Sequence, residues 1–246
     1  SFIMITSKSN ATVVADAKLK DKKGRREQGK FLIEGRKLIR DAAARGVTFD
    51  RIFVTEDFSG DLPPCEVSCV SESVLKCISD TKTNQGAVGV AYLPEQAVYD
   101  GENALLLDRV QDPSNIGSLL RTACAAGYKN VFLVDCADVF SPKAIRCGMS
   151  GQFSLNFFEV SEESFLSKHG GEWIVCADMD GENVFEAACP EKHILVLGNE
   201  GQGVSENLMR AAKQKVKIPM QNNLESLNVA VSGGIIMYQL NRRQWR

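Results

Sequence analysis

The sequence predicts an α/β protein with two domains, the second built on a mostly parallel sheet. Short apolar runs recur between helical patterns in the second half, and because they are hydrophobic on both faces they indicate strands covered by helices on each side. Between the two halves, the stretch "LPEQAVYDGEN" (93–103) loses periodicity and gathers proline, glycine and charge. We therefore predict one domain at residues 1–94, a linker at 95–102 and a second domain at 103–246.

Alternating and apolar segments define the elements of each domain. In the first domain, a helix is expected near 36–45, and strands are expected at 31–35, 51–55, 66–70 and 88–92. In the second domain, strands are expected at 104–108, 131–135, 173–177, 194–198 and 215–219. Because parallel sheets bind ligands at the carboxyl ends of their strands, the residues directly after these runs are the candidates for a functional site.

Composition and charge are those of an ordinary globular chain. The formal net charge is −2, and no apolar run approaches the roughly 18 residues of a membrane span. The first residues lack the basic-then-apolar pattern of a secretory signal, so we expect a cytoplasmic protein without membrane association. The eight cysteines are scattered without a CxxC pair, which predicts reduced, mostly buried thiols, no disulfides and no metal site.

The stretch "KLKDKKGRREQGKFLIEGRKLIR" (18–40) is strongly basic, with ten basic and three acidic residues. One interpretation is a solvated helix face, and the other is a surface that contacts the phosphates of a nucleic acid. On the second interpretation, Gly24 and Gly29 favour a partly flexible arm. The candidate RNA-binding residues of this arm are Lys18, Lys22, Lys23, Arg25 and Arg26.

The first strand junction of the second domain, "RVQDPSNIGSLLRTACAAG" (109–127), has the pattern of a helix. Ser114 or Asn115 is expected to cap its start and Gly127 to end it. Arg121 shares its face of the helix with the small residues Gly117, Ser118 and Ala125. This face is able to approach a ligand or a subunit, although an ordinary surface arginine is the alternative.

The second junction, "VLGNEGQGVS" (196–205), resembles a nucleotide-binding turn, but its spacing is GxxGxG rather than the dinucleotide GxGxxG. Its glycines allow a ligand to approach main-chain groups closely, and Ser205 is placed to cap a following helix. Glu200 at the centre is unsuited to a phosphate cradle but is able to accept hydrogen bonds. The alternative is a plain turn with a solvated acid.

The third junction, "IPMQNNLESLNVAVSGGIIMYQL" (218–240), pairs a loop with a helix that Ser226 is expected to cap. Gly233 and Gly234 within this helix cost about 1 kcal/mol each relative to alanine. We therefore expect the helix backbone to approach another element closely at these glycines, either a neighbouring subunit or the sheet. Packing alone does not explain Asn228 in the first turn.

Together and in this order, the three junctions resemble the three sequence motifs of the SpoU branch of the SPOUT methyltransferases, and the resemblance covers the second domain. "SPKAIRCGMSGQF" (141–153) also resembles a family segment, with Gly148 and Ser150 standing where a serine and a glycine are expected. "KGRREQGKFLIEG" (23–35) and the helix after it make the first domain resemble the L30e-like substrate-binding domain of many members.

The resemblance implies an S-adenosylmethionine-dependent transfer of a methyl group to a ribose 2′-hydroxyl of RNA, with a deep trefoil knot around the cofactor. By analogy with relatives, the first domain favours ribosomal over transfer RNA, and a homodimer is expected whose helix contact includes the stripe Ala230, Gly233 and Gly234. Cofactor contacts carry over to Gly198, Ile218, Met220 and Leu227. Catalytic roles carry over to Asn115, Arg121, Glu200, Ser226 and Asn228.

Within that set, the resemblance assigns the main catalytic role to Arg121. A guanidinium with a pKa of about 12 or above is a poor base, so we expect Arg121 to bind the phosphate beside the target ribose and to stabilise the developing alkoxide. Glu200 and Asn228 are expected to orient that arginine and the ribose, and Asn115 to hold the loop.

Two other classes of protein are compatible with parts of the pattern. A non-catalytic RNA-binding or ribosome-assembly protein could retain the fold without turnover, although Arg121, Glu200 and Asn228 argue against it. A nicotinamide-dependent dehydrogenase requires a glycine fingerprint after the first strand of its sheet, and "DRVQDPSNIG" (108–117) does not supply one. Both histidines, His169 and His193, lie outside the motifs, which disfavours histidine-based hydrolysis.

Overall fold

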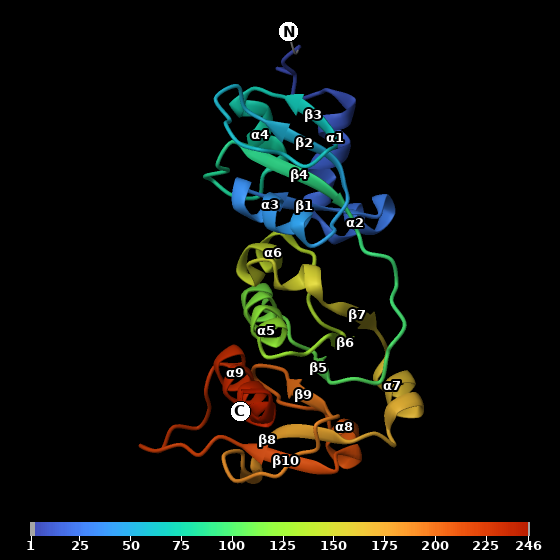
Figure 1. Cartoon of the computed structure of the whole chain (residues 1–246), viewed down its shortest axis with the longest axis vertical. Helices are drawn as coiled ribbons and strands as arrows, with labels where there is room; N and C mark the ends of the chain where they lie inside the picture. Colours follow the sequence, from blue (N-terminus) through green and yellow to red (C-terminus); the bar gives the residue numbers. More distant parts are fainter. Residues whose placement is uncertain (1–2, 246) are drawn as a thin grey trace. The chain divides into compact units, whose positions relative to one another are not determined.

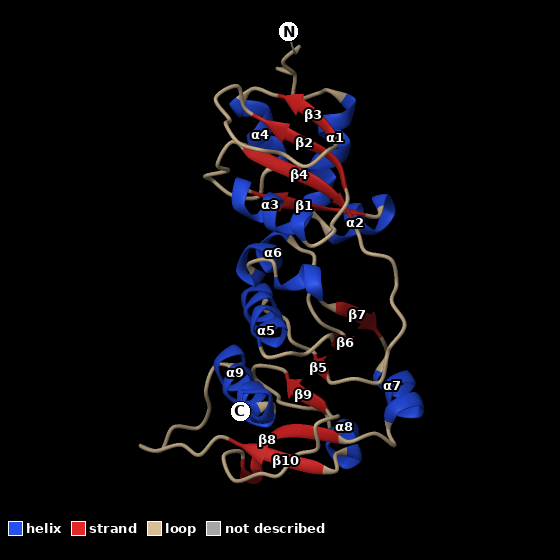
Figure 2. Cartoon of the chain, in the orientation of Figure 1, coloured by secondary structure: helices blue, strands red, loops and turns tan. Residues whose placement is uncertain are grey.

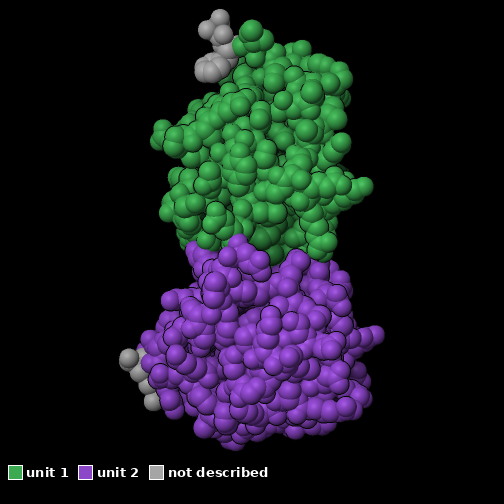
Figure 3. Space-filling model, turned by 90° about the vertical axis from the view of Figure 1, so that its right-hand side faces the viewer, with its two compact units in different colours: residues 1–95, 138–153 green, residues 96–137, 154–246 purple. Residues whose placement is uncertain are grey.

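The computed structural model describes residues 3–245, which form two compact units. Unit 1 contains the residues up to Glu95 together with Asp138–Phe153, and unit 2 contains Gln96–Ala137 and the residues from Ser154 onward (Figure 3). We predicted a single change of domain near residues 95–102. The segment Asp138–Phe153 nevertheless groups with unit 1, because Phe140, Ile145 and Phe153 pack in the same apolar cluster as Phe31.

Unit 1 is a four-stranded mixed sheet with helices on both faces (Figure 1). Its strand order is β1-β4-β2-β3, and β2 is parallel only to β3. The strands are β1 (Lys30–Glu34), β2 (Phe49–Val54), β3 (Glu66–Cys69) and β4 (Ala87–Tyr92). The helices are α1 (Ala11–Ala17), η1 (Lys18–Lys20), α2 (Lys22–Gln28), α3 (Arg36–Ala44), α4 (Glu72–Ile78), α6 (Pro142–Gly148) and η2 (Gly151–Ser154). One apolar cluster joins the sheet to α1 and α4, and another joins it to α3 and α6.

Unit 2 is a six-stranded, entirely parallel sheet in the order β10-β8-β9-β5-β6-β7. The strands are β5 (Ala104–Asp108), β6 (Asn130–Val134), β7 (Asn156–Glu159), β8 (Ile174–Asn183), β9 (Ile194–Gly198) and β10 (Gln214–Lys217). The helices are α5 (Pro113–Ala125), α7 (Glu162–His169), α8 (Glu206–Ala211), α9 (Val229–Leu240) and η3 (Arg242–Trp245). Figure 2 shows these helices on both sides of the sheet, so the predicted fold class is confirmed.

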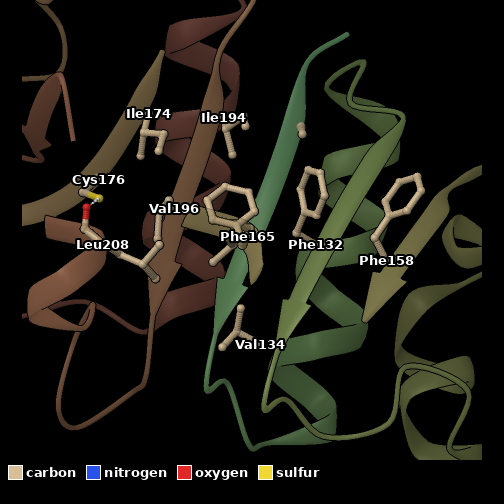
Figure 4. Packing of buried hydrophobic residues seen from close by; sticks show 11 residues of the cluster. Phe132, Val134, Phe158, Phe165, Ile174, Cys176, Ile194, Val196 and Leu208 are labelled. Carbon is tan, nitrogen blue, oxygen red and sulfur yellow. Dashed lines mark hydrogen bonds between the residues drawn. The ribbon is translucent and has the colours of Figure 1, made fainter. Parts of the chain in front are cut away.

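The core of unit 2 follows from the alternation of side chains along its strands. On one face, Phe132, Val196 and their neighbours pack against Phe165 of α7 and Leu208 of α8, as Figure 4 shows. On the other face, α5 and α9 pack together, and α9 also packs against β9. A Cβ at position 233 would lie 2.6 Å from Leu119 and 2.7 Å from Leu197, so Gly233 permits this close packing. Of the two explanations left open for this glycine, packing within the chain is sufficient.

All nine predicted strands are present, and β7 is the strand that sequence reasoning missed. It has only four residues, lies at the edge of the sheet and is partly exposed, so its apolar signal is weak. β8 was predicted too short, because beyond Ala177 it continues to Asn183 through charged and exposed residues. The knot expected from the resemblance stays a prediction.

In the segment 141–153, Gly148 and Ser150 stand where the family pattern has a serine and a glycine, and the backbone there allows a test. Ser150 has a φ of 73°, a left-handed conformation that costs a non-glycine residue about 1–2 kcal/mol. We expect Ser150→Gly to raise the free energy of unfolding by about 0.5–1 kcal/mol in urea titrations. Gly148→Ala should lower it by about 1–3 kcal/mol, because a Cβ there would overlap the amide of buried Gln152. Equal effects of the two substitutions would contradict this explanation.

A buried histidine makes the stability of unit 2 depend on pH. His193 Nδ1 lies 2.9 Å from the Pro190 carbonyl, and Tyr128 Oη lies 2.7 Å from Nε2, a pattern that the neutral ring satisfies by donating to Pro190 and accepting from Tyr128. Burial lowers the pKa of His193, while hydrogen bonds to the backbone of Pro190 and Glu191 oppose this effect.

The sign of this dependence follows from proton uptake. Below its ordinary pKa of about 6.5, the unfolded histidine binds a proton that the folded one does not, so stability is complete above pH 6.5 and is lost as the pH falls toward the folded pKa. We expect urea midpoints to fall between pH 6.5 and 5, and to fall less in His193→Gln. An identical decline in both proteins would exclude His193 as the cause.

Candidate active site

The candidate site lies at the carboxyl edge of the parallel sheet of unit 2. From β5 the chain continues to β6 and β7 on one side, and it then returns to build β8, β9 and β10 on the other. The loops after β5 and β9 therefore meet where the strand order reverses, which is the usual ligand crevice of such sheets. Asp108 and Gly198, the last residues of these two strands, are direct partners in the sheet register.

The loop after β9 is folded tightly on itself. Asn199 and Gly203 exchange two backbone hydrogen bonds of 3.1 and 2.9 Å, and Asn199 Oδ1 accepts from the amides of Gly201 and Gln202. A Cβ at position 198 would overlap the backbone of Gly203, so Gly198 is required for the fold of the loop. Ser205 caps α8 through the amide of Leu208, as predicted.

Three predicted residues from three separate motifs meet beside this loop. Glu200 Oε1 accepts from the Asp112 amide at 3.1 Å and from Asn115 Nδ2 at 3.4 Å, and Glu200 Oε2 lies 3.5 Å from the Gln111 amide. Asn228 Nδ2 donates to Asn115 Oδ1 at 3.0 Å. Asn115 thus joins the loop after β9 to the start of α9.

The charge of Glu200 is stabilised by these contacts. Partial burial acts to raise the pKa of Glu200, but hydrogen bonds from its own amide, from the Asp112 and Gln111 amides and from Asn115 outweigh burial and lower the pKa below its ordinary value. Glu200 is therefore an ionised acceptor at neutral pH, which suits a residue that orients neighbouring groups rather than one that donates a proton.

The two helices at the site begin at residues other than those predicted. Asp112, rather than Ser114 or Asn115, caps α5 and accepts from the Ser114 amide, and this leaves the Asn115 side chain available for Glu200. Asn228, rather than Ser226, caps α9 and accepts from the amides of residues 230 and 231. Both predictions were wrong because several capping residues stand side by side, and the direction of the incoming chain decides between them.

Arg121 lies in the middle of α5 and is exposed. Its side chain makes no hydrogen bond or salt bridge with the residues between 3 and 245. It lies six positions after Asn115, which places the two on different faces of the helix. Glu200 and Asn228 were expected to orient Arg121, but among the described residues they bond to Asn115 and to backbone amides. The guanidinium is thus free to contact a bound ligand.

Of the predicted cofactor residues, Gly198 ends β9 and the other three follow β10. Ile218 and Met220 are half-buried, whereas Ser226 and Leu227 are exposed in the loop that leads to α9. The donor set consists of apolar side chains and main-chain groups, and Arg109, the nearby basic residue, is paired with Asp108. Such a set fits an adenosyl ligand that carries no phosphate. The individual roles of these residues stay predictions.

Sequence reasoning missed Asp108 and Arg109. The carboxylate of Asp108 is completely buried, accepts from the Ser205 amide at 2.8 Å and is paired with the Arg109 guanidinium at 3.1 Å. Arg109 also donates to Gln202 Oε1 at 2.8 Å and to the Gly203 carbonyl at 3.1 Å. This pair ties the end of β5 to the second half of the loop after β9. The available signal was an acid directly after the apolar run "ALLL" (104–107), where a buried strand ends.

The basic stretch of unit 1 is ordered, and the prediction of a flexible arm was wrong. Lys18, Lys22, Lys23 and Arg26 are exposed on η1 and α2. Arg25 is only 3% exposed; its Nε and second terminal nitrogen lie 2.8 and 2.7 Å from Asp138 Oδ2, and its first donates to two backbone carbonyls. Arg25 therefore has a structural role, and we remove it from the RNA-binding candidates.

The thiols and acids of the described chain form no evident metal centre. All eight cysteines are free, two of them buried and six partly exposed, so fewer are buried than predicted. Burial raises the pKa of Cys136 to about 11 and that of Cys176 to about 12, which keeps these thiols protonated. Within residues 3–245, no three histidine, cysteine or acidic side chains lie close enough to hold a metal ion, and no helix is long and apolar enough to cross a membrane.

Comparison with known families gives two matches that divide the chain. Residues 102–238 match the SpoU rRNA Methylase family, and residues 10–89 match the MRM3-like substrate binding domain. These matches confirm the resemblance drawn from the three motifs.

Individual relatives match over nearly the whole length. The 23S rRNA (guanosine(2553)-2′-O)-methyltransferase RlmP of Bacillus subtilis is 32% identical, with 96% of this chain and 98% of the relative covered. The mitochondrial rRNA methyltransferase 3 of Xenopus laevis is 25% identical over 91% of this chain and 72% of the relative. Among solved structures, the AdoMet-bound rRNA methyltransferase of Sinorhizobium meliloti superposes with a TM-score of 0.86 at 27% identity, covering 98% of both chains.

Proposed function

Because this chain belongs to the SpoU rRNA methylase family, we propose that it transfers the methyl group of S-adenosylmethionine to a ribose 2′-hydroxyl of ribosomal RNA. The observation that carries the proposal is the junction of Glu200, Asn115 and Asn228 beside the Gly198 loop. It unites the three motifs at the carboxyl edge where parallel sheets bind ligands. The relatives' names support ribosomal rather than transfer RNA.

The residues of the site would divide the work of binding and orientation. When bound, S-adenosylmethionine supplies a methyl group already activated on a sulfonium, so the protein has to align the hydroxyl and help to remove its proton. The backbone around Gly198 and the side chains of Ile218, Met220 and Leu227 would hold the adenosyl part. Arg121 would bind the phosphate beside the target ribose and stabilise the alkoxide, since a guanidinium is a poor proton acceptor.

The polar junction would position the elements around that reaction. Glu200, through Asn115, fixes the start of α5, the helix that carries Arg121. Asn228 fixes the start of α9, and Ser226, two positions before Asn228, lies exposed in the loop that would face the ribose. A cytoplasmic location and a knotted loop crossing accompany this proposal as family expectations.

We also propose that the chain acts as a homodimer through α9 and the loop before it. Leu224, Val231 and Tyr238 are 60%, 54% and 43% exposed, and Leu227, a cofactor candidate, lies among them in the sequence. Burial of these apolar side chains by a second copy would remove them from water. Light scattering of the wild type and of Val231→Glu tests this, and a wild-type monomer at micromolar concentration would exclude it.

The enzymatic proposal is tested with labelled S-adenosylmethionine and separate pools of ribosomal and transfer RNA. Label should enter ribosomal RNA, and mapping of ribose methylation should locate one 2′-O-methylated nucleotide. A non-catalytic RNA-binding or ribosome-assembly protein would label neither pool, and it would show no heat of S-adenosylmethionine binding in calorimetry. Either result would overturn the proposal.

A further inference from the structure

Unit 1 carries a groove of about 980 Å³ at one edge of its four-stranded sheet. The groove is lined by residues that follow β2 and β3, by the loop before β4, by Arg36 at the start of α3 and by Met4. Its volume is that of a site for one nucleotide-sized ligand, for which roughly 300–1,000 Å³ is usual. It is formed entirely by residues of unit 1 and thus lies outside the methyl-transfer site.

A buried carboxylate fixes the loop that forms one wall of this groove. Glu34, only 8% exposed at the end of β1, accepts from Thr81 Oγ1 at 2.8 Å, from Ser79 Oγ at 3.1 Å and from the Asp80 amide. Every polar group in this cluster has a partner, so the backbone of residues 79–81 is held in place. The side chains that follow, Lys82 to Gln85, are therefore presented from a rigid support.

The far end of the same loop is also ordered by local contacts. Asn84 Oδ1 accepts from the Gly86 amide at 3.0 Å, and Gln85 adopts a φ of 54°. A Cβ at position 35 would lie 2.8 Å from Gln85 Oε1, so the absence of a side chain at Gly35 lets the Gln85 amide lie against the start of α3. Two amide side chains thus stand next to each other at the groove.

The charge of the groove argues against a general phosphate channel. Its lining has two basic side chains, Arg36 and Lys82, and three acidic ones, Glu56, Asp57 and Glu72. Neither basic side chain is paired with another of the residues that the structure describes. Additional exposed basic residues lie along α3 outside the groove, at Lys37 and Arg40. The three carboxylates would repel a run of several phosphates inside the groove, whereas a single phosphate could bind to Arg36 and Lys82 at its wall.

The remaining side chains suit the edge and face of a base. Asparagine and glutamine amides pair with adenine, carboxylates accept from the amino group of cytosine, and aromatic rings stack on unpaired bases. The groove contains all three kinds of group, with Phe58 as its half-buried aromatic residue. Bases offer these edges and faces together only where they are unstacked.

We propose that this groove binds an unpaired nucleotide of the RNA substrate, with Asn84 and Gln85 at the base and Arg36 and Lys82 at an adjoining phosphate. The inference rests on the proposed RNA substrate, and it adds a recognition point remote in sequence from the three motifs. It assigns to the groove a part in choosing the RNA and no part in binding the cofactor.

The test uses the full chain and a fluorescent, unstructured RNA of about 12 nucleotides with mixed sequence, titrated at several salt concentrations. Asn84→Ala/Gln85→Ala is expected to weaken binding by about 5- to 150-fold, the range of 1–3 kcal/mol for a base contact, with an unchanged salt slope. Arg36→Gln should reduce that slope by about 0.7, the value for one phosphate of a single strand.

Matched controls separate this inference from the proposed function. Lys22→Glu/Lys23→Glu on α2 should reduce the salt slope of RNA binding but leave unchanged the loss of affinity that Asn84→Ala/Gln85→Ala causes. All variants should bind S-adenosylmethionine in calorimetry as the wild type does. If Asn84→Ala/Gln85→Ala binds the RNA like the wild type, the inference fails. It also fails if this variant loses methylation activity only on particles that contain ribosomal proteins, because the groove would then bind a protein. If the wild type itself binds no S-adenosylmethionine, the proposed function is what fails.

Discussion

Replacing Arg121 with alanine is expected to lower kcat for RNA methylation by about 10²- to 10³-fold, the usual cost of removing one group that stabilises a developing oxyanion. The fold should be unaffected, because Arg121 is exposed and makes no polar contact with the residues described here. The melting temperature and the affinity for S-adenosylmethionine should therefore equal those of the wild type. Single-turnover methylation of the mapped RNA, together with calorimetry, measures these three quantities.

Two further variants define what Arg121 does. Arg121→Lys keeps the charge but loses the planar fork that binds phosphate, so its rate should fall between those of wild type and alanine variant. Arg210→Ala, which removes an exposed arginine paired with Glu206 in α8, is the matched control and should retain full activity. Wild-type kcat in Arg121→Ala would remove this residue from the mechanism.

Asp108→Asn is expected to destabilise unit 2 by about 2–3 kcal/mol and to weaken S-adenosylmethionine binding at least about tenfold. Asp108 is completely buried, and neutralising it leaves the Arg109 guanidinium without its ionic partner. The expected loss of unfolding free energy is smaller than for a fully buried ion pair, because the Arg109 side chain is 30% exposed and solvent screens its charge. The cofactor effect follows because the same carboxylate holds the Ser205 amide at the end of the Gly198 loop.

The control for this variant is another acid at the carboxyl end of a strand. Asp135 stands directly after β6 but is exposed, so Asp135→Asn should alter neither the urea midpoint nor the cofactor affinity. Calorimetry at a temperature where both variants are folded separates a loss of affinity from a loss of fold. Normal S-adenosylmethionine binding by folded Asp108→Asn would show that the loop keeps its shape without this carboxylate.

Much of the site could be predicted because its residues lie in local patterns. The strands of unit 2 are recognisable as apolar runs, and Glu200 and the glycines after β9 stand out in the sequence itself. The site roles of Gly198 and Asn115 came from the resemblance to the family motifs, which are also local patterns. Their meeting at one edge follows from the parallel arrangement of β5 and β9. The closeness of Asn115 to Asn228, 113 positions away, could not have been obtained from spacing.

Other features were decided by packing between distant segments. Whether a basic residue faces water or a carboxylate depends on what lies next to it, and Arg25 is buried against Asp138 and two backbone carbonyls. In the sequence, Asp108 is the ordinary end of a strand. Its role depends on the loop after β9, whose Ser205 amide donates to the Asp108 carboxylate. The groove of unit 1 likewise arises from five separate segments that carry no common motif.

The sequence by itself determined the class of the fold, the order of the strands along the chain and the family, since apolar periodicity and short motifs are local properties. Tertiary structure alone decided which capping residue begins α5 and α9, which charges are paired and which side chains line a groove. These depend on the direction in which chain segments arrive and on the desolvation of groups far apart in sequence, and neither is encoded in any single stretch.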